Sequence, residues 1–364
     1  MNVTTKFILA AAVIVALTVL WVSSSMTPKS TEEVVMGATL PLSGDLAFLG
    51  EGYKNGMELA LSELQDTTFT YKIIYEDDRF DPKTGATTAS KLLSVNKVDG
   101  IFSFGSPVGN VVSPLAEDYK IVHINGIASD QNVAVGRYNF VHWTPPYKES
   151  ELLIQELQKR GIQSVAIIAA NQPGTLAVAT QVEKDISNSD VTLAGYEMYN
   201  PGETDMRTQI AKLKTTNADI YMLVSMSPEL EIITHQMREL GVTAPLTSIE
   251  SFEWTTQPEL FEGMWFVNAA DPTTEFVAKY EARYGTAPTV GAANGYDAVM
   301  LFVKGVESAA QGVMKPTSEQ VTNALHNIRD HKGAVGELSV DDDGLVVSEP
   351  VVRTIQNGKP MTIK

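Results

Sequence analysis

Residues 34–42, VVMGATLPL, form an apolar run that leads into the loop SGDLAFLG at residues 43–50. In residues 51–64, which follow, apolar side chains recur at intervals of three and four. The run predicts a buried β-strand, and the intervals predict a helix with one apolar face. A buried strand that leads through a loop into such a helix is the unit from which parallel α/β sheets are built.

The same unit recurs along the chain in two blocks. The first block continues with strands predicted at 69–75, 100–104 and 121–124 and helices at 82–95 and 110–119, the first of them capped by Asp81. After Pro145 and Pro146, the second block has predicted helices at 149–160, 176–186, 207–214 and 229–240 and strands at 164–169, 192–196, 220–224, 246–249 and 263–268. Helices then dominate residues 275–328, and a hairpin at 336–347 and a strand at 351–355 close the chain. The predicted fold is α/β, with two doubly wound, Rossmann-like lobes between which the chain crosses more than once.

Composition excludes several classes of function. The chain has 364 residues, enough for two domains, and 44 acidic against 27 basic side chains give it a net charge of −17. A nucleic-acid-binding protein needs a basic surface, so this class is set aside. The absence of cysteine excludes disulfides, thiolate metal sites, a cysteine nucleophile and lipid attachment through an N-terminal cysteine.

The N-terminus carries a targeting signal. Lys6 precedes an apolar run at residues 7–22, and three serines follow it. This pattern is typical of a secretory signal peptide, but the cleavage pattern is poor, so an uncleaved signal anchor is an almost equal alternative. In both cases residues 1–33 are a signal segment plus linker, the rest of the chain is extracytoplasmic, and only this segment meets the membrane.

Polar residues follow several predicted strands, at the edge where open α/β sheets bind ligands. Ser106, Gly109 and Asn110 lie in the loop after strand 100–104, where they can donate hydrogen bonds or cap the next helix. Ser129 follows strand 121–124 and offers a hydroxyl and an N–H to a carboxylate, unless it belongs to an ordinary turn. Glu250 follows strand 246–249 and is either an ammonium ligand or a solvated loop acid. A charge-assisted hydrogen bond of this kind contributes roughly 1.5–3 kcal/mol.

The sequence contains no convincing catalytic or metal-binding pattern. The five histidines are scattered, and no nucleophile has a base and an acid in a recognisable context. Residues 341–344, DDDG, join two apolar strands and fit a hairpin turn better than a calcium loop. We therefore expect a binding protein without a cofactor or metal rather than an enzyme.

The order and spacing of several short segments carry a family resemblance. They are 37–44 (GATLPLSG), 76–78 (EDD) with Asp81-Pro82, the Gly105 loop, 165–168 (VAII) and 295–298 (GYDA). Over about residues 34–364 the chain resembles the periplasmic branched-chain amino-acid binding proteins, the solute receptors of ABC transporters with the type I fold. The resemblance implies three crossovers at a hinge, an N-lobe of residues 34–146 and 273–330, and a C-lobe of 147–272 and 331–364.

The resemblance also implies roles for single residues. The ligand carboxylate would be held by the loops at Gly109-Asn110 and Ala128-Ser129, and the ligand ammonium by Glu250. The family's aromatic walls fall on smaller or different residues, which predicts a wider pocket. These positions are Phe48 or Leu49, Gly174, and Ser225 or Met226.

Two functions follow from this resemblance. The first is the receptor of an ABC importer for an amino acid or a related small polar ligand, with the permease subunits as partners. The second is a sensory module of the same fold that feeds a signalling system.

Overall fold

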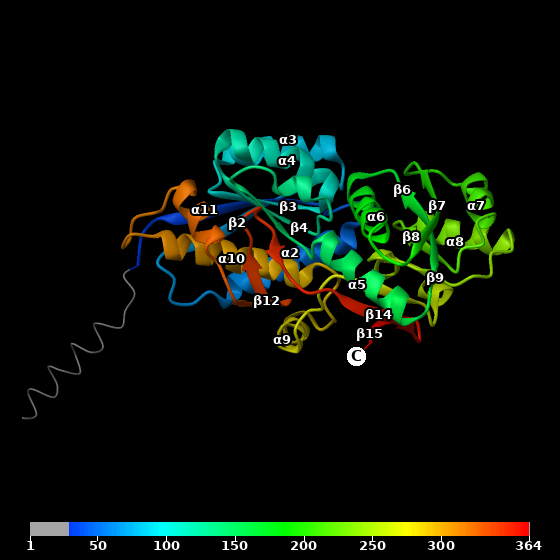
Figure 1. Cartoon of the computed structure of the whole chain (residues 1–364). Helices are drawn as coiled ribbons and strands as arrows, with labels where there is room; N and C mark the ends of the chain where they lie inside the picture. Colours follow the sequence, from blue (N-terminus) through cyan, green and yellow to red (C-terminus); the bar gives the residue numbers. More distant parts are fainter. Residues whose placement is uncertain (1–28, 364) are drawn as a thin grey trace, which may run out of the picture.

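Two parallel β-sheets, one in each lobe, organise residues 29–363, the part of the chain that the computed structural model describes (Figure 1). The predicted signal segment at residues 7–22 lies outside this part. Within residues 29–363, no helix has both the length and the apolar character needed to cross a membrane. The predicted α/β class with two doubly wound lobes is confirmed.

The first lobe contains a five-stranded parallel sheet of order β2-β1-β3-β4-β5. Its strands are β1 (Glu33–Leu40), β2 (Thr70–Asp77), β3 (Gly100–Phe104), β4 (Val122–Gly126) and β5 (Asn139–His142). Parallel neighbours require crossover connections, and these are α2 (Ala47–Glu63), α3 (Pro82–Lys91) and α4 (Gly105–Tyr119). The sequence did not predict β5, because this edge strand is short and carries buried polar side chains instead of an apolar run.

The second lobe repeats this architecture with a four-stranded parallel sheet of order β7-β6-β8-β9. Its strands are β6 (Ser164–Ala170), β7 (Thr192–Tyr199), β8 (Ile220–Val224) and β9 (Leu246–Thr247). Its helices are α5 (Pro146–Lys159), α6 (Pro173–Ile186), α7 (Arg207–Lys214) and α8 (Glu229–Glu239). Strand β10 (Trp265–Asn268) continues the lobe and pairs with the end of the chain.

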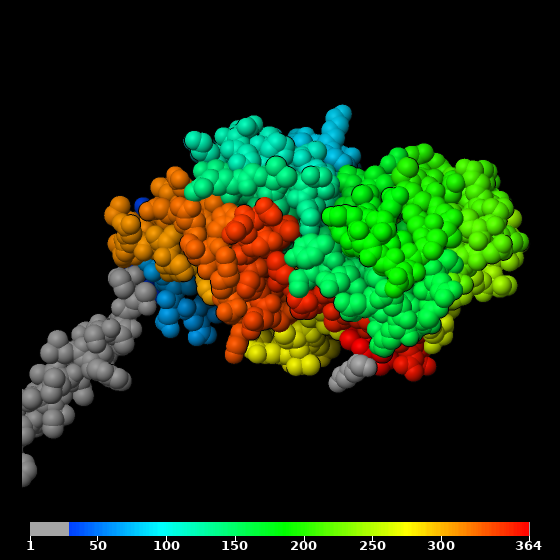
Figure 2. Space-filling model, viewed as in Figure 1, coloured from blue at the N-terminus to red at the C-terminus, as the bar shows by residue number. Residues whose placement is uncertain are grey.

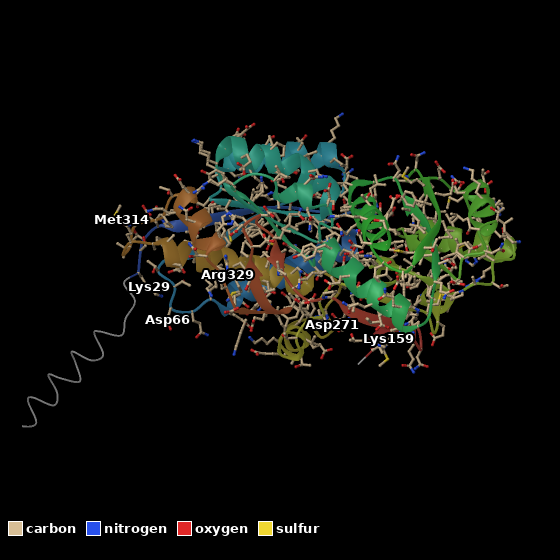
Figure 3. The ribbon with its side chains drawn as sticks, in the orientation of Figure 1. Lys29, Asp66, Lys159, Asp271, Met314 and Arg329 are labelled. Atoms are coloured by element: carbon tan, nitrogen blue, oxygen red, sulfur yellow. The ribbon has the colours of Figure 1, made fainter. Side chains whose placement is uncertain are left out.

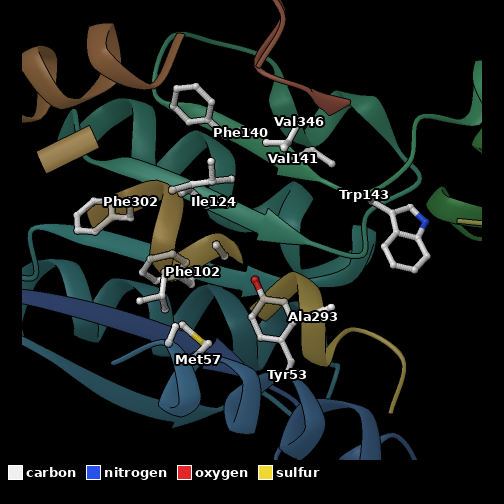
Figure 4. Close-up of a cluster of buried hydrophobic side chains, with 14 of the residues drawn as sticks. Tyr53, Met57, Phe102, Ile124, Phe140, Val141, Trp143, Ala293, Phe302 and Val346 are labelled. Atoms are coloured by element: carbon white, nitrogen blue, oxygen red, sulfur yellow. The ribbon is translucent and has the colours of Figure 1, made fainter. Parts of the chain in front are cut away.

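Three helices then return to the first lobe: α9 (Thr274–Tyr284), α10 (Ala292–Ala309) and α11 (Ser318–His326). Helix α10 packs closely on α2, because Gly56 and Gly295 face the partner's backbone and any Cβ there would collide with a carbonyl. Phe302 of α10 meets Phe102 of β3 edge-on at 5.7 Å between ring centroids. These rings lie in the core of the first lobe (Figure 4).

The closing hairpin belongs to the first lobe, where the sequence analysis had placed it in the second. Strands β11 (His331–Gly333), β12 (Gly336–Val340) and β13 (Val346–Val347) form an antiparallel sheet with the predicted turn at 341–344. The apolar side chains Leu338, Val340 and Val346 are buried in the first-lobe core, and Leu345 bridges to Val141 of β5. Only β14 (Val351–Gln356) and β15 (Lys359–Thr362) reach the second lobe, where β14 pairs with β10.

Three short segments carry the chain between the lobes, at residues 143–145, 269–273 and 348–350. One buried side chain joins all three. The Thr144 hydroxyl accepts a hydrogen bond from the Ala270 N–H at 3.0 Å and shares another with the Ser348 hydroxyl at 2.8 Å. The crossovers therefore form one hydrogen-bonded bundle.

Candidate ligand-binding cleft

The cleft lies where the two lobes meet, along the seam between the cyan and green surfaces in Figure 2. It holds about 600 Å³ of space, part of it open to solvent. Both lobes line it, mainly with residues at the carboxyl ends of strands and in the first turns of helices. The lining residues are Leu49, Phe80, Phe104, Gly105, Ser106, Pro107, Ile127 and Ser129 from the first lobe, and Gln172, Gly174, Thr175, Val178, Val224, Ser225, Met226, Ile249, Glu250, Ser251 and Trp254 from the second.

Glu250 is the only charged side chain among these lining residues. It follows β9 at the entry to a short 3-10 turn (Ser251–Trp254), and its φ of 62° is unusual for a residue other than glycine. A hydrogen bond from its N–H to the Val267 carbonyl, at 2.8 Å, fixes this backbone. Strain of this kind persists only where the surroundings enforce it, and it is concentrated at functional sites.

The Glu250 carboxylate reaches across to the first lobe. It accepts hydrogen bonds from the Trp143 indole N–H and from the Ser129 hydroxyl, the latter at 3.2 and 3.3 Å to its two oxygens. Trp143 points from the first-lobe core toward the second lobe (Figure 4). Burial raises the pKa of Glu250, and the hydrogen bonds from Trp143 and Ser129 oppose this effect. The side chain is thus a buried acid held by donors from the opposite lobe.

Two helix N-termini also face the cleft, one from each lobe. Helix α4 starts at Gly105 and α6 at Pro173, and neither has a side-chain cap. Free N–H groups and the helix dipole make such ends suitable for a ligand carboxylate. The ends approach each other so closely that a Cβ built on Gly174 lies 3.0 Å from the Ser106 hydroxyl oxygen. The cleft therefore combines an acid with two positively polarised helix ends.

This chain matches the family model described as periplasmic binding protein over residues 33–359. The chain belongs to the periplasmic binding protein family. Members of this family are extracytoplasmic solute-binding receptors rather than enzymes.

Similar proteins agree with this assignment. The Leu/Ile/Val-binding protein BraC3 of Rhizobium johnstonii is 22% identical over 349 residues, which cover 90% of this chain and 92% of that protein. A leucine-binding protein of Thermotoga maritima superposes with a TM-score of 0.81 at 20% identity, covering 91% of this chain and 98% of that one. A solute-binding protein of Rhodopseudomonas palustris, solved with benzoate, has a TM-score of 0.79 at 17% identity, covering 91% and 96%. At these identities the solved structures establish the shared type I fold.

Seven residues named from the sequence lie in the cleft of this periplasmic binding protein. They are Leu49, Ser106, Ser129, Gly174, Ser225, Met226 and Glu250. The small residue Gly174 predicted a wider pocket, but in the structure it has a different effect. Because Gly174 has no side chain, α6 comes close to Ser106, and the cleft narrows there.

The other four named residues do not line the cleft. Helix α4 begins at Gly105, earlier than the predicted start at residue 110, so Gly109 and Asn110 lie inside the helix. Gly109 packs against Asn125 and Val133, and the Asn110 amide donates to Asp130 at 2.8 Å. Two further residues also point elsewhere: Ala128 is buried in the core, and Phe48 is 48% exposed on the first turn of α2.

Sequence reasoning missed most of the apolar wall. Phe104, Ile127 and Val224 lie at or just beyond the carboxyl ends of strands, so the general rule for open sheets could have found them. Phe80 carries no such signal. It lies in a loop with a φ of 59°, and its N–H donates a hydrogen bond to the Asp78 carboxylate at 2.8 Å.

A second polar network resembles a catalytic triad but lies away from the cleft. The Ser103 hydroxyl is 2.7 Å from His123 Nε2, and His123 Nδ1 is 2.8 Å from the Asn139 amide oxygen. All three side chains are buried between strands of the first sheet, and burial lowers the pKa of His123 to about 4. The network joins β3, β4 and β5. In the part of the chain described, no cluster of three or more potential ligand side chains is placed to hold a metal ion.

Proposed function

We propose that this chain is the extracytoplasmic receptor of an ABC importer and that it captures a small ligand with an ammonium group and a carboxylate, an amino acid above all. The observation that carries the proposal is the position of Glu250 in the cleft, facing uncapped helix ends. A buried acid attracts an ammonium, and the N–H groups and Ser106 suit a carboxylate. The permease subunits of the importer are the proposed partners.

The apolar wall indicates the third part of the ligand. Leu49, Phe80, Phe104 and Trp254 offer aliphatic and aromatic surface on both sides of the cleft. Such a wall suits a branched aliphatic or aromatic side chain. The similar proteins named for leucine or solved with benzoate share carboxylate ligands. A carboxylate alone would leave Glu250 without a cation, so its presence favours an amino acid over a simple acid.

A matched ligand series tests the proposal. We expect leucine to raise the melting temperature in a thermal-shift assay, and 4-methylpentanoate, which lacks the ammonium group, to have little effect. A ligand at 100 times its Kd stabilises the folded state by about 2.7 kcal/mol, which is readily measured. Phenylalanine and benzoate form a second pair for the aromatic case. Equal shifts with and without the ammonium group would contradict the role of Glu250.

Substitution of Glu250 tests the same contact from the protein side. Glu250→Gln keeps the shape but removes the charge, so calorimetry should show affinity for the best amino acid reduced by about tenfold or more, equivalent to 1.4 kcal/mol. The control is Glu259→Gln, an exposed glutamate in the following 3-10 turn (Pro258–Phe261), which should bind like the wild type. Unchanged affinity in Glu250→Gln would exclude an ammonium contact.

A further inference from the structure

A second acid lies directly behind Glu250. Glu149 is in the first turn of α5 and is completely buried. Neither of its carboxylate oxygens has a hydrogen-bond donor among the described residues. Its carboxyl group lies within hydrogen-bonding reach of Glu250, which is the only charged group that acts on it appreciably. The cleft acid is therefore one member of a buried carboxyl pair.

No cation neutralises this pair within residues 29–363. Helix α5 packs on α6, β10 and β14, and β10 (WFVN) contains no titratable side chain. The charged groups of α5 and of the elements around it are engaged in ion pairs, exposed, or in the last turn of α6. They are Lys148 with Glu349, Glu156 with Lys159 and Arg160, Arg353 with Glu253 and Asp271, His142 with Asp297, the exposed Glu151, and Glu183, Lys184 and Asp185 in the last turn of α6.

Two ionised carboxylates in contact, both buried, would repel each other without compensation. A single proton removes the repulsion and supplies the missing hydrogen bond. The surroundings decide which acid holds it. Glu250 receives donors from Trp143 and Ser129, which stabilise a negative charge, whereas Glu149 receives none. The charge therefore belongs on Glu250 and the proton on Glu149.

We propose that Glu149 keeps its proton at neutral pH and donates a hydrogen bond to Glu250, so that the pair presents a single negative charge to the cleft. Burial and the Glu250 charge raise the pKa of Glu149 well above its usual range, in agreement with this arrangement. Glu149 is then a positioning residue, which fixes the charge and orientation of Glu250. This inference rests on the proposed function. A single negative charge on the pair matches a ligand with one ammonium group.

Infrared spectroscopy of the full chain tests the proton without any ligand. At neutral pH, the difference spectrum of wild type minus Glu149→Gln should contain the carbonyl stretch of one protonated carboxylic acid. The control Glu151→Gln changes an exposed glutamate on the same helix, and its difference spectrum should contain only an ionised carboxylate. An ionised carboxylate in the Glu149→Gln difference spectrum would overturn the proposal.

The pH dependence of stability provides a second readout. A glutamate in an unfolded chain has a pKa of about 4.3, so a raised folded pKa means that the folded state binds the proton more tightly. This stabilisation is fully present below the unfolded pKa and is lost as pH rises through the folded pKa. Glu149→Gln has no proton to lose at this position. Its melting temperature should therefore rise relative to that of the wild type as pH increases. A merely structural role would give a difference that does not depend on pH.

Ligand binding separates this inference from the proposed function. Leucine is the probe, measured by calorimetry at neutral pH. If it binds, Glu149→Gln should keep most of the affinity because glutamine also donates to Glu250, whereas Glu250→Gln should lose it. Loss of binding in Glu149→Gln would count against the proton-donor role. If no amino acid binds the wild type, the proposed function fails, while the infrared result still decides the state of Glu149.

Discussion

At the scale of single residues, a partly buried ion-pair cluster lies next to the crossovers. Arg353 of β14 contacts both Glu253 and Asp271, and Thr362 also donates to Asp271. Asp271 lies at the junction of the two lobes (Figure 3). Burial raises the pKa of Glu253, and the Arg353 guanidinium opposes this effect. Charges in such a cluster depend on one another, because Glu253 and Arg353 are largely removed from water.

Removal of Arg353 should therefore be costly. Arg353→Met leaves Glu253 buried without a cation, and breaking a buried pair in this way costs about 3–5 kcal/mol of unfolding free energy. Chemical denaturation measures it. The matched control is Arg207→Met, because Arg207 also pairs with two carboxylates, Asp205 and Glu239, but on the surface, and little change is expected there. The double variant Glu253→Gln/Arg353→Met should recover part of the loss, and no recovery would contradict the coupling.

The sequence could predict those site residues whose position in the fold depends on the local sequence pattern. Glu250 follows an apolar run, so its position at the end of a strand could be predicted. Glu149 could not be recognised, because an acid in a first helical turn is ordinary. Its significance comes from Glu250, which is 101 positions away along the chain. Gly109 was misplaced because nothing local marks the start of α4 at Gly105.

At the scale of elements, the junction depends on the hydroxyl of Thr144. This side chain is 1% exposed and joins the three crossovers through Ala270 and Ser348. The crossovers come from distant parts of the chain and have few other ties of this kind. A hinge made of such segments can bend while their mutual spacing is kept.

Thr144→Val should weaken this junction. Valine has nearly the same shape but leaves the partly buried Ala270 N–H and the buried Ser348 hydroxyl short of a partner, which costs about 1–3 kcal/mol of unfolding free energy. Equilibrium denaturation of the full chain measures this loss. Thr144→Ser keeps the hydroxyl and should lie close to the wild type. If both variants lose the same stability, packing of the methyl group is responsible and the hydrogen-bond account is wrong.

The elements that could be predicted are those with a repeated apolar pattern, such as β1, β3 and β8. The membership of the closing hairpin could not be predicted in the same way. Its strands have one apolar face, which could pack on either lobe. The burial of Leu338, Val340 and Val346 in the first-lobe core and the bridge from Leu345 to the edge strand β5 place it in the first lobe. Since β5 has no apolar run of its own, the sequence offered no partner for the hairpin.

At the scale of the whole molecule, the lobes touch where α4 meets α6. Gly174 allows this approach, and the Ser106 hydroxyl fills the remaining space while accepting the Asp130 N–H at 3.1 Å. The cleft is narrow at this contact, although part of it is open to solvent. We expect an amino acid to enter when these helix ends separate, so the proposed function predicts that the lobes move about the crossovers.

A designed disulfide tests this motion. The Ser106 Cβ lies 3.6 Å from a Cβ built on Gly174, within the range of about 3.5–4.5 Å found for disulfides. The chain has no cysteine of its own, so the double variant Ser106→Cys/Gly174→Cys contains a single pair of thiols. We expect oxidation without ligand to join them and to lock the lobes together. Small-angle scattering should then give a smaller radius of gyration than for the reduced variant, and the melting temperature should no longer respond to an amino acid added afterwards.

Reductant should restore both properties of the open form. The single variant Ser106→Cys controls for the loss of the serine hydroxyl. Free uptake of ligand by the oxidised protein would show that the cleft is reached without separation of the lobes.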